Sequence, residues 1–149
     1  MTELEQEKLK SLLEQMMSAT GISPWAVLAM LMLAVFILGF FFDWIEITLI
    51  ILPVFAPIIA QLDFGSHLSD PAMTTTWFAI LMAVNLQTSF LTPPFGFALF
   101  YMKGAAPDGV KLGDIYRGIV PFVLLQLVGL LVLLIWPEIA LWLPRFSAQ

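Results

Sequence analysis

The run PAMTTTWFAILMAVNLQTSFLTPPFGFALFYM, residues 71–102, contains no charged side chain and carries two adjacent prolines in its second half. A helix rises about 1.5 Å per residue and a membrane's hydrocarbon core is about 30 Å thick, so about 20 residues span it. The run is therefore too long for one straight span. Because proline lacks an N–H and clashes with the preceding turn, Pro93 and Pro94 must end or kink the arriving helix. The sequence predicts a discontinuous helix over 74–103, with halves over 74–88 and 95–103.

The rest of the 149-residue chain has a similar composition. Apolar residues make up 60% of the sequence and charged residues 11%, whereas soluble domains are about 45–50% apolar and about 25% charged. A soluble chain of this size cannot bury so much apolar surface. We therefore expect an all-α integral membrane protein in a lipid bilayer. A net charge of −5 argues against nucleic-acid binding, and the lack of cysteine with one histidine, His67, argues against a thiolate or His-cluster site.

The charged residues divide the chain into segments. Residues 1–21 are predicted to form an amphipathic helix, and 22–145 a membrane domain. Within that domain we expect a helical hairpin over 24–62, the broken helix, and a last transmembrane helix over 115–143 that Asp114 caps.

The N-terminal helix is expected to lie on the membrane surface or against a partner. The alternative is a solvated lead-in helix without a specific role. Because the segment has no cationic region before an apolar one, we expect no cleaved signal peptide.

The basic residues predict the topology. Lys103, Lys111 and Arg117 lie in one short loop, whereas residues 63–73 contain no lysine or arginine. The positive-inside rule places 103–117 in the cytoplasm and 63–73 outside. The aromatic residues expected at the two interfaces agree with this orientation: Trp25, Trp77, Trp136 and Trp142 outside, Tyr101 and Tyr116 inside.

The hairpin segment must reverse direction near Asp43. As one helix, residues 24–62 would be about 58 Å long. Either two full spans meet at a cytoplasmic turn with Asp43 and Glu46 in water, or a re-entrant hairpin ends inside the protein. In the second case an acid at that depth is a functional candidate, because its charge needs a cation or proton. The sequence leaves both structures open.

The proline break carries the best candidate site. The hydroxyls and freed carbonyls of Thr88, Ser89 and Thr92 are hard oxygen ligands suited to sodium, with Thr92 also predicted as the N-cap of the second half-helix. The N-terminus of that half-helix suits an anion. Alternatively, the break is a simple kink patched by Ser and Thr, and Asn85 and Gln87 only join helices.

Two stretches resemble a known family. LGFFFDWIEITLIILPVFAPII (38–59) and NLQTSFLTPPFGFALFYMKGAAP (85–107) are similar to the C-terminal end of the large membrane subunit of tripartite ATP-independent periplasmic (TRAP) transporters, most closely the mannitol/chloroaromatic type. The resemblance covers about 22–145. It implies a sodium-coupled, elevator-type transporter in the bacterial inner membrane that imports an organic anion. No cofactor is implied beyond the coupling ion.

The resemblance also implies partners and site residues. The partners are a small membrane subunit and a periplasmic substrate-binding protein. The family's large subunit contains inverted repeats, each with a re-entrant hairpin and a broken helix. The positions that match its ion and substrate site are Gly39 and Asp43 at the hairpin tip and Asn85, Thr88, Ser89, Thr92, Pro93 and Gly96 at the break.

The chain is much shorter than the large subunits it resembles. We expect a fragment, a truncated reading frame or one part of a split subunit, incomplete without the missing N-terminal part. The alternative function is a small membrane scaffold or regulator that transports nothing. No nucleophile–base pair or metal-ligand set points to an enzyme.

Overall fold

The computed structural model of the chain describes residues 21–68, 70–93 and 97–147, together with isolated positions at 4, 7, 8, 11, 12, 15 and 19. Every regular element in these ranges is helical, which confirms the all-α fold class. The helices are α2 (Pro24–Leu38), α3 (Trp44–Ile59), α4 (Thr74–Leu91), α5 (Phe97–Ala105), α6 (Leu112–Ile135) and α7 (Pro137–Ser147). Two short 3₁₀ helices, Gly65–His67 and Pro71–Met73, precede α4. The helix predicted over 1–21 falls mostly outside the described residues.

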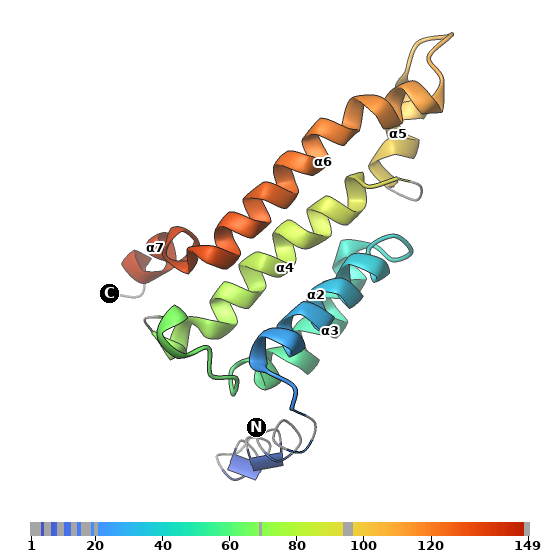
Figure 1. The fold of residues 1–149 in the computed structure, drawn as a ribbon. Coiled ribbons are helices and arrows are strands. Elements are labelled where there is room, and N and C mark those ends of the chain that lie inside the picture. The colour runs from blue at the N-terminus through green and yellow to red at the C-terminus, as the bar shows by residue number, and fades with distance from the viewer. Residues whose placement is uncertain are drawn as a thin grey trace.

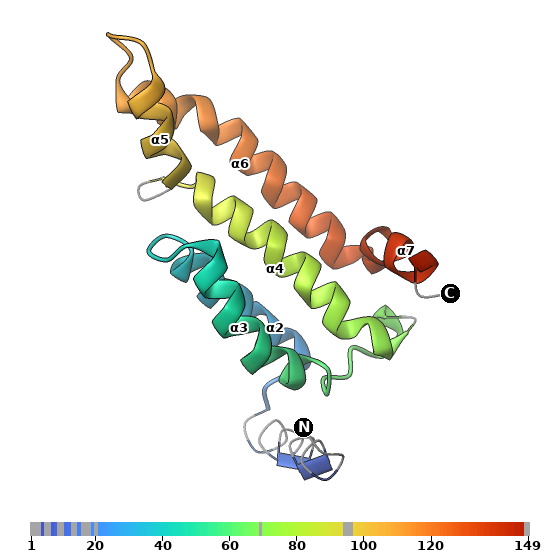
Figure 2. The same cartoon turned by 180° about the vertical axis from the view of Figure 1, so that it is seen from behind.

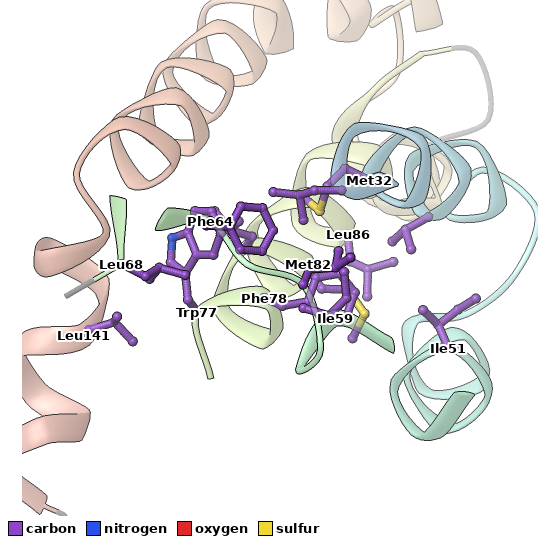
Figure 3. Close-up of a cluster of buried hydrophobic side chains, with 14 of the residues drawn as sticks. Met32, Ile51, Ile59, Phe64, Leu68, Trp77, Phe78, Met82, Leu86 and Leu141 are labelled. Atoms are coloured by element: carbon purple, nitrogen blue, oxygen red, sulfur yellow. The ribbon is translucent and has the colours of Figure 1, made fainter. Parts of the chain in front are cut away.

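Helix α4 is the centre of the fold. The α2–α3 hairpin packs along one side of it and α6 runs antiparallel along the other (Figures 1 and 2). Both sides of α4 are therefore covered, and its large side chains Trp77, Phe78 and Leu81 have no exposed surface. Figure 3 shows the resulting core, in which Met32 of α2 and Ile51 of α3 lie around Met82 and Leu86 of α4.

The two hairpin helices are short. Ser23 caps α2 by accepting a hydrogen bond from the Ala26 N–H (3.3 Å), and Pro24 occupies the first turn. Helices of 15 and 16 residues are about 22 and 24 Å long, less than the hydrocarbon core of about 30 Å. The hairpin tip lies beside the C-terminal end of α4, while the α5–α6 end of the bundle extends further (Figures 1 and 2).

Helix α6 is, within the described ranges, the one helix long and apolar enough to cross a membrane by length and composition. It begins at Leu112, so the prediction that Asp114 caps a helix starting at Ile115 is wrong. Lys111 is the N-cap, and the Asp114 carboxylate accepts a hydrogen bond from its N–H (3.0 Å). Asp114, at the third position of the helix, is therefore the acidic partner of a capping box.

The segment predicted as a single helix over 115–143 is divided at Trp136. Proline at 137 has no N–H to donate to the Leu133 carbonyl, so the α-helical ladder stops there and α7 begins. The side chain of Trp77 supplies the missing donor, because its Nε1–H bonds that carbonyl at 3.0 Å. His67 Nε2 bonds the next carbonyl, that of Leu134, at 2.6 Å.

These two side chains belong to an aromatic cluster, formed by Trp25, Phe64, His67 and Trp77. Trp25 meets His67 edge-on with ring centroids 4.8 Å apart, and Phe64 meets Trp77 at 5.4 Å. Edge-to-face packing of this kind contributes about 0.5–1.5 kcal/mol per pair beyond burial. The cluster ties the start of α2, the 63–68 loop and the start of α4 to the end of α6.

The predicted topology can be tested with single cysteines, since the chain has none. Ser66→Cys and Asp108→Cys lie at exposed positions at opposite ends of the bundle. We choose Asp108 over Gly109 because Gly109 has φ +100°, where a side chain is strained. An impermeant maleimide is expected to label Ser66→Cys from outside and Asp108→Cys only after the membrane is opened. Labelling of both from one side would contradict this topology.

Candidate functional site

The proline break separates α4 from α5. Helix α4 ends at Leu91 and α5 begins at Phe97, so the discontinuity predicted from Pro93 and Pro94 is present. Pro94, Phe95 and Gly96 lie outside the described residues, so the place of Gly96 at the site stays a prediction. The first half-helix is three residues longer than the predicted 74–88. The α-helical hydrogen bonds continue almost to Pro93, the first residue without an N–H to donate.

The end of α4 differs from the prediction in its hydrogen bonds. Thr92 has extended backbone (φ −87°, ψ 124°) and closes the end of α4 rather than starting α5. Its N–H bonds the Ser89 carbonyl (3.1 Å) and its hydroxyl bonds the Thr88 carbonyl (2.7 Å). Both carbonyls expected to lack a donor therefore have one from the same residue. Each still has a second lone pair available.

The three candidate hydroxyls all donate to backbone carbonyls. Besides Thr92, Thr88 donates to the Val84 carbonyl and Ser89 to the Leu86 carbonyl, each at 2.8 Å. A hydroxyl has one proton and two lone pairs, so an oxygen whose proton is already used offers only acceptor sites. That is the state a cation ligand requires. Thr88 and Ser89 are fully buried, which keeps these oxygens away from solvent.

Gly39 brings the hairpin tip onto this end of α4. Gly39 is buried, and a Cβ built on it would lie 2.8 Å from the Ser89 Cβ and closer still to the Ser89 Oγ. Real Cβ atoms do not approach so closely, so only glycine allows this contact. The two motifs that sequence analysis singled out, separated by about 50 residues, therefore meet at Gly39 and Ser89.

Asn85 joins α4 to α2. Its Nδ2 donates to the Met32 carbonyl at 2.7 Å, and the side chain is 4% exposed. This is the helix-joining contact that was the alternative to a ligand role, and the ligand role stays a prediction. Gln87, one turn from the break, is exposed and lines a groove of about 430 Å³ between α3 and α4, with Trp44 and Thr48 on the other wall.

Asp43 is exposed at the hairpin tip and begins α3. Its Oδ1 accepts a hydrogen bond from the Trp44 N–H at 2.7 Å, so the carboxylate caps α3, where the helix dipole favours a negative charge. Glu46, in the first turn of α3, is exposed as well. The capping role explains Asp43 without an ion, and its role as a cation ligand stays a prediction.

The amide of Gln126 in α6 has a property that the sequence does not reveal. The Oε1 atom is buried and has no hydrogen-bond partner within the described part of the chain. An unpaired acceptor in an apolar environment costs about 1–3 kcal/mol. No spacing in the sequence distinguishes such an amide from one that joins two helices.

Known proteins that resemble this chain include large permease proteins of one transporter type. The family model for the "Tripartite ATP-independent periplasmic transporter, DctM component" matches residues 2–139. The chain is 30% identical over 143 residues to the C4-dicarboxylate TRAP transporter large permease protein DctM of Pseudomonas aeruginosa, covering 96% of this chain and 31% of that protein. It is 32% identical over 133 residues to the ectoine/5-hydroxyectoine TRAP transporter large permease protein UehC of Ruegeria pomeroyi, covering 87% and 28%.

A third relative is the sialic acid TRAP transporter permease protein SiaT of Haemophilus influenzae, 28% identical over 127 residues, which are 85% of this chain and 19% of that protein. The chain thus spans less than a third of each of these relatives. They are named as transporter permeases, not as enzymes. No solved structure gives a significant match.

Proposed function

The chain belongs to the DctM component family of tripartite ATP-independent periplasmic transporters, and from this premise we propose that it forms the C-terminal part of a large permease subunit. The complete permease imports an organic anion that a periplasmic substrate-binding protein delivers. Two of the relatives are named for organic acids, a C4-dicarboxylate and sialic acid, which supports an anionic substrate. A small membrane subunit and the N-terminal part of the large subunit complete the assembly in the bacterial inner membrane. Membership of the mannitol/chloroaromatic branch stays a prediction.

We propose sodium as the coupling ion, held at the end of α4. The contact of Gly39 with Ser89 is the observation that carries this proposal, because it places a hairpin tip against the end of α4, where Ser89 and two further hydroxyls offer only acceptor sites. Neutral hydroxyl and carbonyl oxygens replace much of the hydration shell of a sodium ion. The start of the second half-helix supplies partial positive charge for the anion.

The hairpin lengths support the re-entrant structure. Neither α2 nor α3 reaches across about 30 Å of hydrocarbon, and their tip ends beside the break rather than at the far end of the bundle. Irregular backbone at that depth is tolerated where it is buried or lines a cavity. In the proposed elevator movement, the hairpin and the broken helix move together as one body. A scaffold without transport activity has no need of a hairpin tip packed against the end of a broken helix.

The experiment is uptake of radiolabelled C4-dicarboxylate and sialic acid by proteoliposomes that hold the complete assembled transporter, with its binding protein supplied. A sodium gradient is expected to stimulate uptake and an equal potassium gradient is not. Asp43→Asn is expected to weaken the sodium dependence, because it removes the negative charge of the residue that caps the start of α3 at the hairpin tip. The measurement is uptake against sodium concentration.

Glu46→Gln is the matched control, since Glu46 is also exposed and lies in the first turn of α3. It is expected to leave the sodium dependence unchanged. If Asp43→Asn transports with the wild-type sodium dependence, Asp43 is a helix cap in a polar turn and no more. If uptake is the same in sodium and potassium, the sodium proposal itself is wrong.

A further inference from the structure

Helix α7 follows directly after α6, the helix that is long enough to span the membrane. The 24 residues of α6 measure about 36 Å, enough to cross a hydrocarbon core of about 30 Å. Trp136, which is 58% exposed, lies at the end of that span, and Pro137 takes the first position of α7. With 11 residues, α7 is about 16 Å long and cannot cross the membrane itself. In both views it turns away from the axis of α6 (Figures 1 and 2).

The side chains of α7 divide into three faces. Pro137 and Leu141 are buried, and Leu141 points into the same core cluster as Leu68 and Trp77 (Figure 3). At about 100° per residue, the opposite face carries an apolar stripe at i, i+3, i+4 and i+7. The stripe consists of Ile139, Trp142, Leu143 and Phe146, which are 60–71% exposed.

The third face of α7 is charged. Glu138 and Arg145 are two turns apart and form an ion pair along the edge between the buried face and the apolar stripe. The pair leaves this edge without net charge but still polar. A helix with one face on the protein, one apolar face turned outward and a polar edge fits a membrane–water interface.

We infer that α7 lies in the outer membrane–water interface and that the partner of its apolar stripe is the lipid itself. Two further tryptophans near this end of α6 are exposed: Trp136 follows the last residue of α6, and Trp25 contacts His67, which bonds the Leu134 carbonyl. Tryptophan favours the headgroup region. All four stripe residues are large, whereas close helix–helix contacts in membranes use glycine, alanine, serine and threonine. Lipid therefore fits this face better than another helix does.

Spin labels on single cysteines test the inference in the complete assembled transporter, reconstituted in liposomes of phosphatidylethanolamine and phosphatidylglycerol. Phe146→Cys lies at the centre of the stripe, and Ser66→Cys, exposed in the 63–68 loop, is the aqueous reference. Oxygen partitions into lipid and a nickel chelate stays in water. We expect the ratio of oxygen to nickel collision rates to be severalfold higher at Phe146→Cys than at Ser66→Cys.

Both labelled positions are exposed, so the substitutions create no clash in the core. Ile139→Cys, on the same stripe one helical turn before Leu143, is expected to give the same ratio as Phe146→Cys. Nickel access at both stripe positions equal to that at Ser66→Cys would overturn the inference, since α7 would then face water. Immobilised labels that neither reagent reaches would also overturn it, because protein, such as a second copy of the chain, would then cover the stripe. Neither result bears on sodium-coupled transport.

Discussion

Gly39→Ala is expected to reduce sodium-stimulated uptake by the complete transporter to the level measured without sodium. The added Cβ would meet Ser89 at a distance that no packed carbon tolerates, and the Ser89 Cβ, fixed to the α4 backbone, cannot turn away. Overpacking of this kind costs about 1–3 kcal/mol. The equilibrium between a hairpin tip packed on α4 and one displaced from it then shifts about 5- to 150-fold toward the displaced state. The measurement is uptake in proteoliposomes together with thermal stability of the purified assembly.

Two further variants make the Gly39 result specific. Gly118→Ala in α6 is the matched control, because a Cβ there meets nothing within 4 Å, and its uptake is expected to equal that of the wild type. Ser89→Gly combined with Gly39→Ala removes the clashing atoms and is expected to restore the thermal stability lost in the single variant. It does not restore full uptake if Ser89 is a ligand. Wild-type uptake by Gly39→Ala alone would show that transport does not depend on this contact.

Replacing Pro93 and Pro94 together by alanine is expected to abolish sodium-stimulated uptake while the protein still inserts. Each interior proline disfavours a helix by about 3 kcal/mol relative to alanine. With an N–H at position 93, the Ser89 carbonyl gains the α-helical donor that Thr92 now replaces. The Thr92 N–H then takes the Thr88 carbonyl from its own hydroxyl, and the oxygens at the end of α4 lose their present arrangement. Uptake and labelling of Ser66→Cys in the same background measure the two outcomes.

The control for the proline pair is Pro121→Ala, an exposed proline inside α6 that is expected to leave uptake unchanged. Thr92→Val keeps the break and removes one oxygen, so its loss of uptake is expected to be milder. If the double variant transports like the wild type, the prolines form only a structural kink. The transport proposal would then need another site.

The sequence predicts the breaks of this fold better than its contacts. Pro93 and Pro94 interrupt α4 as expected, because a missing N–H acts on the local ladder whatever surrounds it. Pro137 divides the segment that was predicted as one helix over 115–143 by the same rule. The prediction that Thr92 caps the start of the second half-helix is wrong for a local reason. A threonine before a proline suits either the end of one helix or the start of the next.

The contact between Gly39 and Ser89 could not be predicted from the sequence, for a different reason. Each residue stands in a motif that marks it as unusual, yet the spacing of 50 positions contains no signal for which side chain a hairpin tip will meet. The same holds for Trp77, which was expected in the aromatic belt at the outer interface. That prediction is wrong: Trp77 is fully buried in the core, with its indole N–H bonded to the Leu133 carbonyl. Contacts of this kind depend on how helices pack, and a pattern within one helix does not determine that.

The shortness of the hairpin helices has a consequence for biosynthesis. A ribosome releases α2 and α3 before α4, and neither is long enough to be recognised and held in the bilayer as a separate span. The amide of Asn85 that bonds the Met32 carbonyl becomes available only with α4. Helices α2 and α3 are therefore integrated into the membrane together, and only after α4 has been synthesised. A chain truncated before residue 74 would expose an apolar hairpin to cellular proteases rather than retain it in the membrane.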